Sequence, residues 1–291
     1  MSIAPGNELL RKHLDRLRSS PNETLLLDGG TGEKLFLRGV KDDRKIWSAT
    51  AIVNKEYHGI LEEVHRSFID AGSQAITTNS YGITPGVGFT DGDEVKRLFG
   101  ISGEIARRAA TDGQDSVALV LGSLGPLVES YRPDLIMKHD DGVKKYRYPI
   151  EGLHPFVDIF LAETMSISDE ACQVIDALSI FYNYQAKQSS STSMSEQVIA
   201  SQPPRIFLGA YANRLTPVHE EWTLESSEEA QAMREDLLPD EYWREFVNRW
   251  RGYEDAASNS NVSLIGGCCG IGPSHISLLS SKLNNIQSLD H

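Results

Sequence analysis

Two adjacent cysteines near the C-terminal end carry the most specific chemistry in the chain. Cys268 and Cys269 stand in "GGCCG" after an apolar run, and the third cysteine, Cys172, lies far upstream. Catalytic zinc usually takes three protein ligands and leaves a fourth position for substrate. Neighbouring side chains on a regular strand point to opposite faces, so the two thiols can share one ion only if the flanking glycines let the backbone leave strand geometry. Two small buried hydrophobic side chains are the alternative interpretation.

Two acids close other apolar runs. Asp28 follows "TLLL" and precedes Gly29, and Glu163 follows "VDIFLA". A carboxylate at the mouth of a site suits a substrate ammonium, and the loop after Asp28 lacks the glycine spacing and the lysine of phosphate-binding loops. An unpaired buried acid is costly, so Glu163 is expected to face a ligand or a cation. A tight turn capped by Asp28 and a rim salt bridge of Glu163 are the alternatives.

Thr78 and Asn79, in "TTNSYG", follow a further apolar run and offer donors and acceptors suited to the carboxylate or amine of an amino acid. Such residues also commonly bind the backbone of their own loop. None of the eight histidines shows zinc-ligand spacing. His58 and His65, on one predicted helix, are expected to be solvated or hydrogen-bonded.

Apolar, β-branched runs alternate with helical patterns, which indicates βα units and a parallel sheet. An amphipathic helix is expected at the N-terminus, and further helices are predicted over 55–71, 93–111, from about Ser168, over 240–252 and from Pro273. Six strands are predicted at 24–30, 74–81, 117–126, 157–165, 205–213 and 261–267. The candidate residues stand at the C-terminal ends of these strands, the edge that handles substrates in parallel α/β folds.

The predicted fold is a single α/β domain over residues 1–291, of (β/α)8 TIM-barrel type, with its core at about 24–284. We expect an incomplete barrel, because a closed one needs eight strands and only six are clear. The interval 166–205 is too short for two more units, since one βαβ unit takes roughly 30 residues. The fifth and sixth units are therefore predicted to be shortened or missing, with 185–204 as a flexible insertion or junction.

The composition excludes several other classes of protein. A net charge of −13 argues against a nucleic-acid partner, which would need clustered Lys and Arg. No run approaches the ~18 apolar residues of a membrane span, and the N-terminus lacks the features of a secretory signal. Three cysteines, two of them adjacent, do not form a disulfide framework, so a cytoplasmic location is expected.

In chain order these stretches resemble the homocysteine S-methyltransferase family, zinc-dependent barrel enzymes related to betaine–homocysteine methyltransferase and to the homocysteine domain of methionine synthase. The resemblance runs from about Leu25 to Leu283. It rests on "LLLDGGTGEKL", "IWSATAIVNKEYHGILEEVHRSFIDAGSQAITTNSYG", "GSLGPLVESYRPD", "VDIFLAETM", "GAYANRLTPVHEEW" and "LIGGCCGIGPSHI".

The resemblance implies a methyltransferase of methionine biosynthesis that holds Zn2+ through cysteines matching Cys268 and Cys269. Homocysteine would supply its sulfur as a further zinc ligand and, as a thiolate, take a methyl group from a sulfonium donor, S-methylmethionine or S-adenosylmethionine. The resemblance also implies that Asp28, the Gly29 backbone and Glu163 meet the ammonium end of the substrate. Thr78 and Asn79 would line the same mouth.

The third zinc cysteine of the family, in an Asn-Cys step on its sixth strand, has no counterpart in this chain. Cys172 falls within the helix predicted after the fourth strand, and such helices run away from the mouth. Three hypotheses follow. A water, Glu163 or another residue completes the zinc site of a working enzyme; the chain is a catalytically impaired paralogue or truncated isoform acting at most as a binding module; or Cys268 or Cys269 is the nucleophile of an unrelated thiol enzyme.

Overall fold

The computed structural model describes residues 5–20, 23–41, 43, 46–85, 88–113, 115–188, 206–216, 233–251 and 262–287. Six parallel strands form its centre: β1 (Leu25–Leu26), β2 (Ala75–Thr77), β5 (Leu119–Leu124), β6 (Ile159–Ala162), β7 (Leu208–Ala212) and β8 (Val262–Gly267). Each lies inside one of the six predicted ranges and is shorter than predicted.

The strands form one continuous row that remains open within the described residues. The pairing orders are β1-β8-β7 and β2-β5-β6, and the Gln74 backbone N donates to the Leu26 carbonyl oxygen at 2.8 Å, which joins β1 to β2. The row therefore runs β7-β8-β1-β2-β5-β6. No ladder among the described residues joins β6 to β7, the place where the two missing units were predicted.

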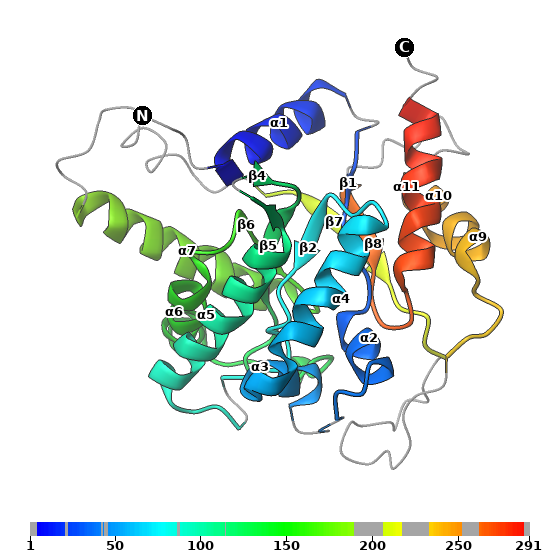
Figure 1. Cartoon of the computed structure of the whole chain (residues 1–291). Coiled ribbons are helices and arrows are strands. Elements are labelled where there is room, and N and C mark those ends of the chain that lie inside the picture. The colour runs from blue at the N-terminus through cyan, green and yellow to red at the C-terminus, as the bar shows by residue number, and fades with distance from the viewer. Residues whose placement is uncertain are drawn as a thin grey trace.

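Helices surround the strands, and several of them cover the outer faces of the strands (Figure 1). They are α1 (Pro5–Ser19), α2 (Thr31–Leu37), α3 (Thr50–Val53), α4 (His58–Asp70), α5 (Gly92–Ala109), α6 (His139–Leu153), α7 (Ser168–Gln188), α9 (Pro239–Tyr242), α10 (Asn248–Arg251) and α11 (Pro273–Gln287). A π-helical segment, Trp243–Val247, joins α9 to α10, and a small antiparallel pair, β3 (Thr111–Asp112) and β4 (Asp115–Ser116), follows α5. No helix in the described part of the chain is both long and apolar enough to cross a membrane.

Local sequence accounts for several of these boundaries. Asp91 caps α5 by accepting a hydrogen bond from the Asp93 backbone N at 3.0 Å, and Gly72, with φ of +103°, ends α4 as predicted. Helix α6 was not predicted, because its sequence is polar and contains Pro149. Helix α7 continues to Gln188, within the predicted junction at 185–204, and the rest of that junction, 189–204, lies outside the described residues.

Two groups of apolar side chains hold the strands. The interior group consists of Leu25, Leu27, Ala75, Leu119, Leu121 and Leu264, against which Leu9, Leu10 and Leu17 of α1 pack. A larger group joins the outer faces of the strands to the helices, with Phe68, Leu98, Ile150 and Leu279 among its members. Helix α1 thus covers the N-terminal ends of the strands, while α2 and α3 lie at their C-terminal ends (Figure 1). The C-terminal strand ends, where the predicted residues stand, are left uncovered by α1.

Candidate metal and substrate site

The two thiols lie on a turn directly after β8. The Cys268 backbone N donates to the Ala212 carbonyl oxygen at 2.9 Å, and the Ile271 N donates back to the Cys268 carbonyl oxygen at 3.0 Å. Gly270 takes a φ of +83° at this turn, a conformation that favours glycine. The backbone therefore leaves strand geometry at the pair, as the sequence requires of two thiols that face one ion.

The separation of the two sulfurs suits a tetrahedral metal. Cys268 Sγ lies 3.8 Å from Cys269 Sγ. Two thiolates about 2.3 Å from one tetrahedral zinc ion would stand about 3.8 Å apart. The pair therefore fits two corners of such a site. Among the described residues, no three His, Cys, Asp or Glu side chains are already close enough to hold a metal.

The two thiols titrate as a pair. The hydrogen bond that Cys268 donates raises the pKa of Cys268, and burial raises it further. The same hydrogen bond lowers the pKa of Cys269, which accepts it. The first proton lost therefore leaves a thiolate on Cys269, stabilised by its neighbour. Cys172 is exposed on α7, away from this turn.

Asp28 lies at the end of β1, buried among backbone groups. One carboxylate oxygen accepts from the Thr77 backbone N at 2.8 Å and the other from Thr77 Oγ1 at 2.9 Å. Burial raises the pKa of Asp28 to about 7, and the charge of Glu163 adds to the shift. The neighbouring Gly29 has no room for a side chain, because a Cβ there would lie 2.1 Å from the Ile271 carbonyl oxygen.

Glu163 directly follows β6 and is held on both oxygens. Ser123 donates its hydroxyl proton to one oxygen, and the Tyr211 hydroxyl donates to the other at 2.6 Å. Burial raises the pKa of Glu163, while these two hydrogen bonds oppose the shift. Its charge acts on Asp28, Cys268 and Cys269 alike. The structure therefore brings the two predicted acids and the two predicted thiols together at the C-terminal ends of the strands. We call this region, with Asp28, Glu163, Cys268 and Cys269, the mouth.

Thr78 and Asn79 lie at the same strand end, with side chains engaged by the protein. Thr78 Oγ1 is 2.9 Å from Ser80 Oγ and accepts from the Ser123 backbone N at 2.9 Å. Asn79 Nδ2 donates to the Ser48 carbonyl oxygen at 2.7 Å. These hydrogen bonds agree with the alternative stated above, in which the two side chains support the backbone of the loops. A role of Thr78 and Asn79 in binding substrate stays a prediction.

Several residues of the mouth were not identified from the sequence. Ser123 and Tyr211 orient Glu163, and their inward position could be found only from strand register. Tyr131 lies near the thiols: partial burial and then the charges of Cys268 and Cys269 raise the pKa of its hydroxyl. The rings of Trp47 and Tyr81 lie 6.3 Å apart, and the Tyr81 hydroxyl bonds to Ser130, the neighbour of Tyr131. An aromatic rim therefore adjoins the thiols and the acids.

The expectation for His65 was wrong. His58 Nε2 bonds to the Ile52 carbonyl oxygen at 3.0 Å, as expected. His65 is fully buried, and neither ring nitrogen has a hydrogen-bond partner among the described residues. The face of α4 that carries His65 packs into the core. The position of a single histidine in the helical pattern did not show that it lies on this buried face.

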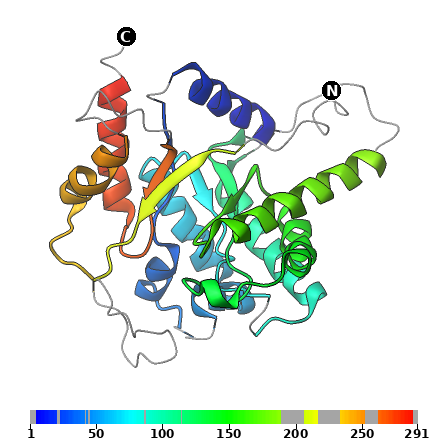
Figure 2. The same ribbon diagram turned by 180° about the vertical axis from the view of Figure 1, so that it is seen from behind.

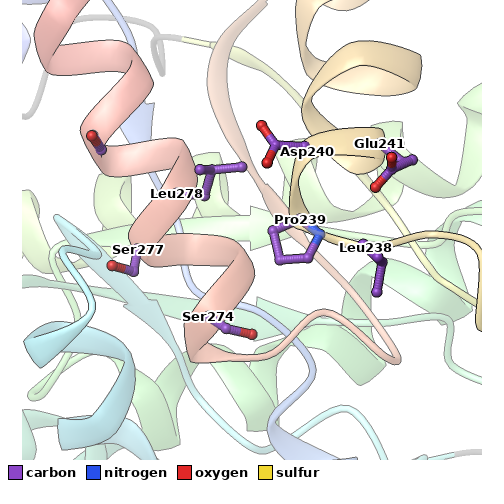
Figure 3. Close-up of a pocket in the computed structure, with 8 residues that line it drawn as sticks. Leu238, Pro239, Asp240, Glu241, Ser274, Ser277 and Leu278 are labelled. Atoms are coloured by element: carbon purple, nitrogen blue, oxygen red, sulfur yellow. The ribbon is translucent and has the colours of Figure 1, made fainter.

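A separate pocket of about 580 Å3 opens between α9 and α11 (Figure 3). None of the predicted site residues lines it. Its Asp240 carboxylate pairs with Lys282 at 3.1 Å, in an exposed ion pair. We therefore place the candidate site at the C-terminal strand ends and not in this pocket.

Comparison with known proteins gives a consistent result. A sequence model described as homocysteine S-methyltransferase matches residues 25–201 and 187–283. The homocysteine S-methyltransferase of Escherichia coli is 37% identical over 129 residues, which are 41% of this chain and 39% of that protein. Homocysteine S-methyltransferase 1 of Saccharomyces cerevisiae is 30% identical over 88 residues, 28% of this chain and 25% of that protein. These alignments thus span well under half of the curated relatives.

The fold has a counterpart among solved structures. The metallated form of the E. coli homocysteine methyltransferase MmuM superposes with a TM-score of 0.64 at 24% identity, over 94% of this chain and 99% of that one. An apo form of the same enzyme superposes with a TM-score of 0.56 at 21% identity. The described strands and helices therefore follow the architecture of that protein.

Proposed function

The chain belongs to the homocysteine S-methyltransferase family, and from this premise we propose that it transfers a methyl group to the sulfur of homocysteine to give methionine. One observation carries the proposal: the Cys268–Cys269 pair, with sulfurs 3.8 Å apart, lies at the same strand ends as the buried Asp28 and the half-buried Glu163. Within the barrel type of this family, the open interval between β6 and β7 would correspond to missing fifth and sixth units.

We propose that Cys268 and Cys269 hold Zn2+. When bound, the metal would lower the pKa of the homocysteine thiol and hold the sulfur as a thiolate nucleophile. The protein's part is to present two thiols on a turn fixed by backbone bonds to Ala212 and Ile271. Because that turn is set by the fold, the pair is ready for a metal without rearrangement of the backbone.

The acids are suited to the amino-acid end of homocysteine. Glu163 is oriented by Ser123 and Tyr211, so its carboxylate is a preorganised acceptor for an ammonium group. Asp28, with a pKa of about 7, would ionise more fully once a cation stands beside it. Gly29 lets the backbone approach the ligand closely, and Thr78 and Asn79 would line the same space.

The mouth favours a cationic methyl donor, either S-methylmethionine or S-adenosylmethionine. Aromatic faces attract cations, and Trp47, Tyr81 and Tyr131 form a rim beside two carboxylates and two thiols. In the transfer, the donor's sulfonium–methyl bond breaks and its electron pair stays on the donor sulfur. The methyl carbon forms a new bond to the homocysteine sulfur, so the donor leaves as a neutral thioether.

Zinc content and methionine formation test the proposal together. We expect about one zinc per purified chain, methionine formed from homocysteine and one of the two sulfonium donors, and loss of both in Cys268→Ser. Cys172→Ser is the matched control, because that thiol is exposed on α7, and it should change neither. A chain without zinc and without turnover would contradict the proposal.

A second candidate function rests on a specific observation, the absence of three converging metal ligands among the described residues. In that case the chain binds homocysteine or methionine without transferring a methyl group. Methionine binding by calorimetry, combined with no turnover at saturating donor and zinc, would favour this candidate.

A further inference from the structure

Asp28, Glu163 and His275 are three candidates for a third metal ligand near the thiol turn. Asp28 has both carboxylate oxygens hydrogen-bonded to Thr77, and Glu163 has both bonded to Ser123 and Tyr211. His275 receives a bond from the Gly272 N on Nδ1, and its Nε2 lies 3.3 Å from the Leu237 carbonyl oxygen. All three side chains already have protein partners.

Glu33 differs from these three residues. Its Oε2 atom is buried and has no hydrogen-bond partner among the described residues. A carboxylate oxygen in that state is costly unless a cation or a donor reaches it. Such an unsatisfied oxygen in the first turn of α2 indicates a ligand that the chain alone does not provide.

The first turn of α2 lies directly against the thiol turn. At Gly30, one residue before α2, a Cβ would stand 2.8 Å from the Cys268 carbonyl oxygen and 3.1 Å from the Cys269 Cα. The Gly30 backbone N also donates to the Ile271 carbonyl oxygen at 2.9 Å. Glu33 also lies close enough to the thiol turn for its charge to act on Cys269.

We infer that Glu33 is the third protein ligand of the metal held by Cys268 and Cys269, in place of the cysteine that the chain lacks. The inference rests on the proposed function. Carboxylate oxygens are ordinary zinc ligands, and two thiolates with one carboxylate carry the same total charge as three thiolates. A fourth position stays open for the substrate sulfur. Because no three described side chains converge on one point, the Glu33 side chain would have to rotate toward the thiols to bind the metal.

Zinc affinity of the full-length chain tests this assignment without recourse to activity. Competition with a chromogenic chelator should show zinc binding weakened by at least about tenfold in Glu33→Gln, since even residues outside the metal's immediate ligands change affinity by ~10–100-fold. Glu163→Gln should keep its zinc affinity and bind methionine more weakly. Glu129→Gln removes an equivalent charge from the loop that carries Tyr131 and should change neither property.

A gain of signal provides the second measurement. In the cobalt-substituted protein, thiolate-to-metal charge-transfer absorbance scales with the number of bound thiolates. The native chain should therefore show the absorbance of two bound thiolates. Glu33→Cys should raise this absorbance by about half if position 33 reaches the metal. This variant also keeps the inference testable if Glu33→Gln folds poorly.

The outcomes separate this inference from the proposed function. Zinc lost in Cys268→Ser but retained in Glu33→Gln, with no added absorbance in Glu33→Cys, overturns the role of Glu33 and leaves the proposed function standing. Weakened zinc binding in Glu163→Gln instead of Glu33→Gln would assign the third ligand to Glu163. A native chain that binds no zinc overturns both the inference and the proposed metal site.

Discussion

Two acids are expected to govern which ligands the mouth accepts. Asp28 is buried and Glu163 is half-buried, and burial raises the pKa of each. No basic side chain is among the hydrogen-bond partners of either carboxylate in the described residues. Desolvated carboxylates without a cation are unstable, so the ammonium or sulfonium group of the proposed substrates would supply the missing positive charge. The same reasoning disfavours anionic substrates.

Asp28→Asn tests this electrostatic role. Methionine is a suitable probe because it has no thiol to titrate and its amino group stays charged between pH 6 and 8. We expect calorimetry to show methionine binding strengthening as pH rises through about 7 in the native chain, as Asp28 ionises. Asp28→Asn should bind about 10–100-fold more weakly at pH 8, from the loss of a charge-assisted hydrogen bond, and without this pH dependence.

Glu163→Gln is the control for that measurement. It also weakens methionine binding, but Asp28 remains, so the rise in affinity with pH should persist. It should occur at a lower pH than in the native chain, because the charge of Glu163 no longer raises the pKa of Asp28. A rise that survives in Asp28→Asn and disappears in Glu163→Gln would transfer the titration to Glu163.

His65 gives the fold a defined sensitivity to acid. Burial lowers the pKa of His65 to about 4, against an ordinary value of 6.5. Its neutral form therefore contributes fully to stability above about pH 6.5, and that contribution is lost as pH falls from 6.5 toward 4, by up to about 1.4 kcal/mol per pH unit. In His65→Leu, urea unfolding should show a smaller loss of stability over this window.

His139 provides the control for the acid sensitivity assigned to His65. His139 is exposed at the start of α6, and His139→Leu should keep the native loss of stability over that window. At pH 8, His65→Leu removes no hydrogen bond from the folded state, because neither ring nitrogen has a partner in the described structure. The free energy of unfolding at this pH should therefore not decrease through a lost hydrogen bond. Equal acid sensitivity in the two variants would contradict the role of His65.

At the scale of elements, the turn after β8 depends on Gly270. Its φ is +83°, and a Cβ there would stand 2.6 Å from Arg214 Cβ. Gly39 has a similar φ of +90° with nothing within 4 Å of its Cβ position. Gly39→Ala should therefore lose about 1–2 kcal/mol of unfolding free energy from φ alone. Gly270→Ala should lose about 1–3 kcal/mol more from overpacking.

Denaturant unfolding of both alanine variants measures the difference. Because the thiols are carried on the same turn, Gly270→Ala should also reduce zinc content, while Gly39→Ala should not. Equal losses of stability would show that Arg214 moves away without cost and that the turn tolerates a side chain.

Helices and strands were predictable where the hydrophobic periodicity agrees with the residues that end an element. Apolar runs ended by a polar residue predicted all six parallel strands and the edge at which Asp28, Glu163 and the thiols meet. Helix α4 was predictable from its spacing and from Gly72. Helix α6 was not, because Pro149 and its charged residues conceal the face that buries Tyr146 and Ile150.

Parts of the site required the structure. Ser123 and Tyr211 are ordinary strand residues in the sequence, and only strand register turns them toward Glu163. The position of Glu33 depends on how α2 lies against the thiol turn, a contact between segments more than 200 residues apart. Sequence spacing does not specify such a contact.

At the scale of the whole molecule, the row of strands that the structure describes ends at β6 on one side and at β7 on the other. The Tyr211 hydroxyl, on β7, and the Glu163 carboxylate, after β6, bond at 2.6 Å across this interval. Figure 2 views the molecule from the side on which β7 lies in front of the other strands. This one hydrogen bond thus orients Glu163, the acid proposed to bind substrate, and connects the two ends of the row.

Strand β7, at one end of the described row, exposes a large apolar side chain, Leu208, which is 59% exposed. Strand edges of this kind promote association between chains. Leu208→Lys should therefore lower light scattering of the native protein during incubation at high concentration. Its unfolding free energy should stay within about 0.5 kcal/mol of the native value, as for other surface substitutions.

Leu238→Lys is the matched control, because Leu238 is 55% exposed and lies beside α9 on no strand edge (Figure 3). It removes a similar apolar side chain and adds the same charge, so it separates the effect of the strand edge from that of net charge. We expect scattering to fall clearly in Leu208→Lys and little in Leu238→Lys. Equal decreases would mean that charge alone controls association and that the edge of β7 is not a site of contact between chains.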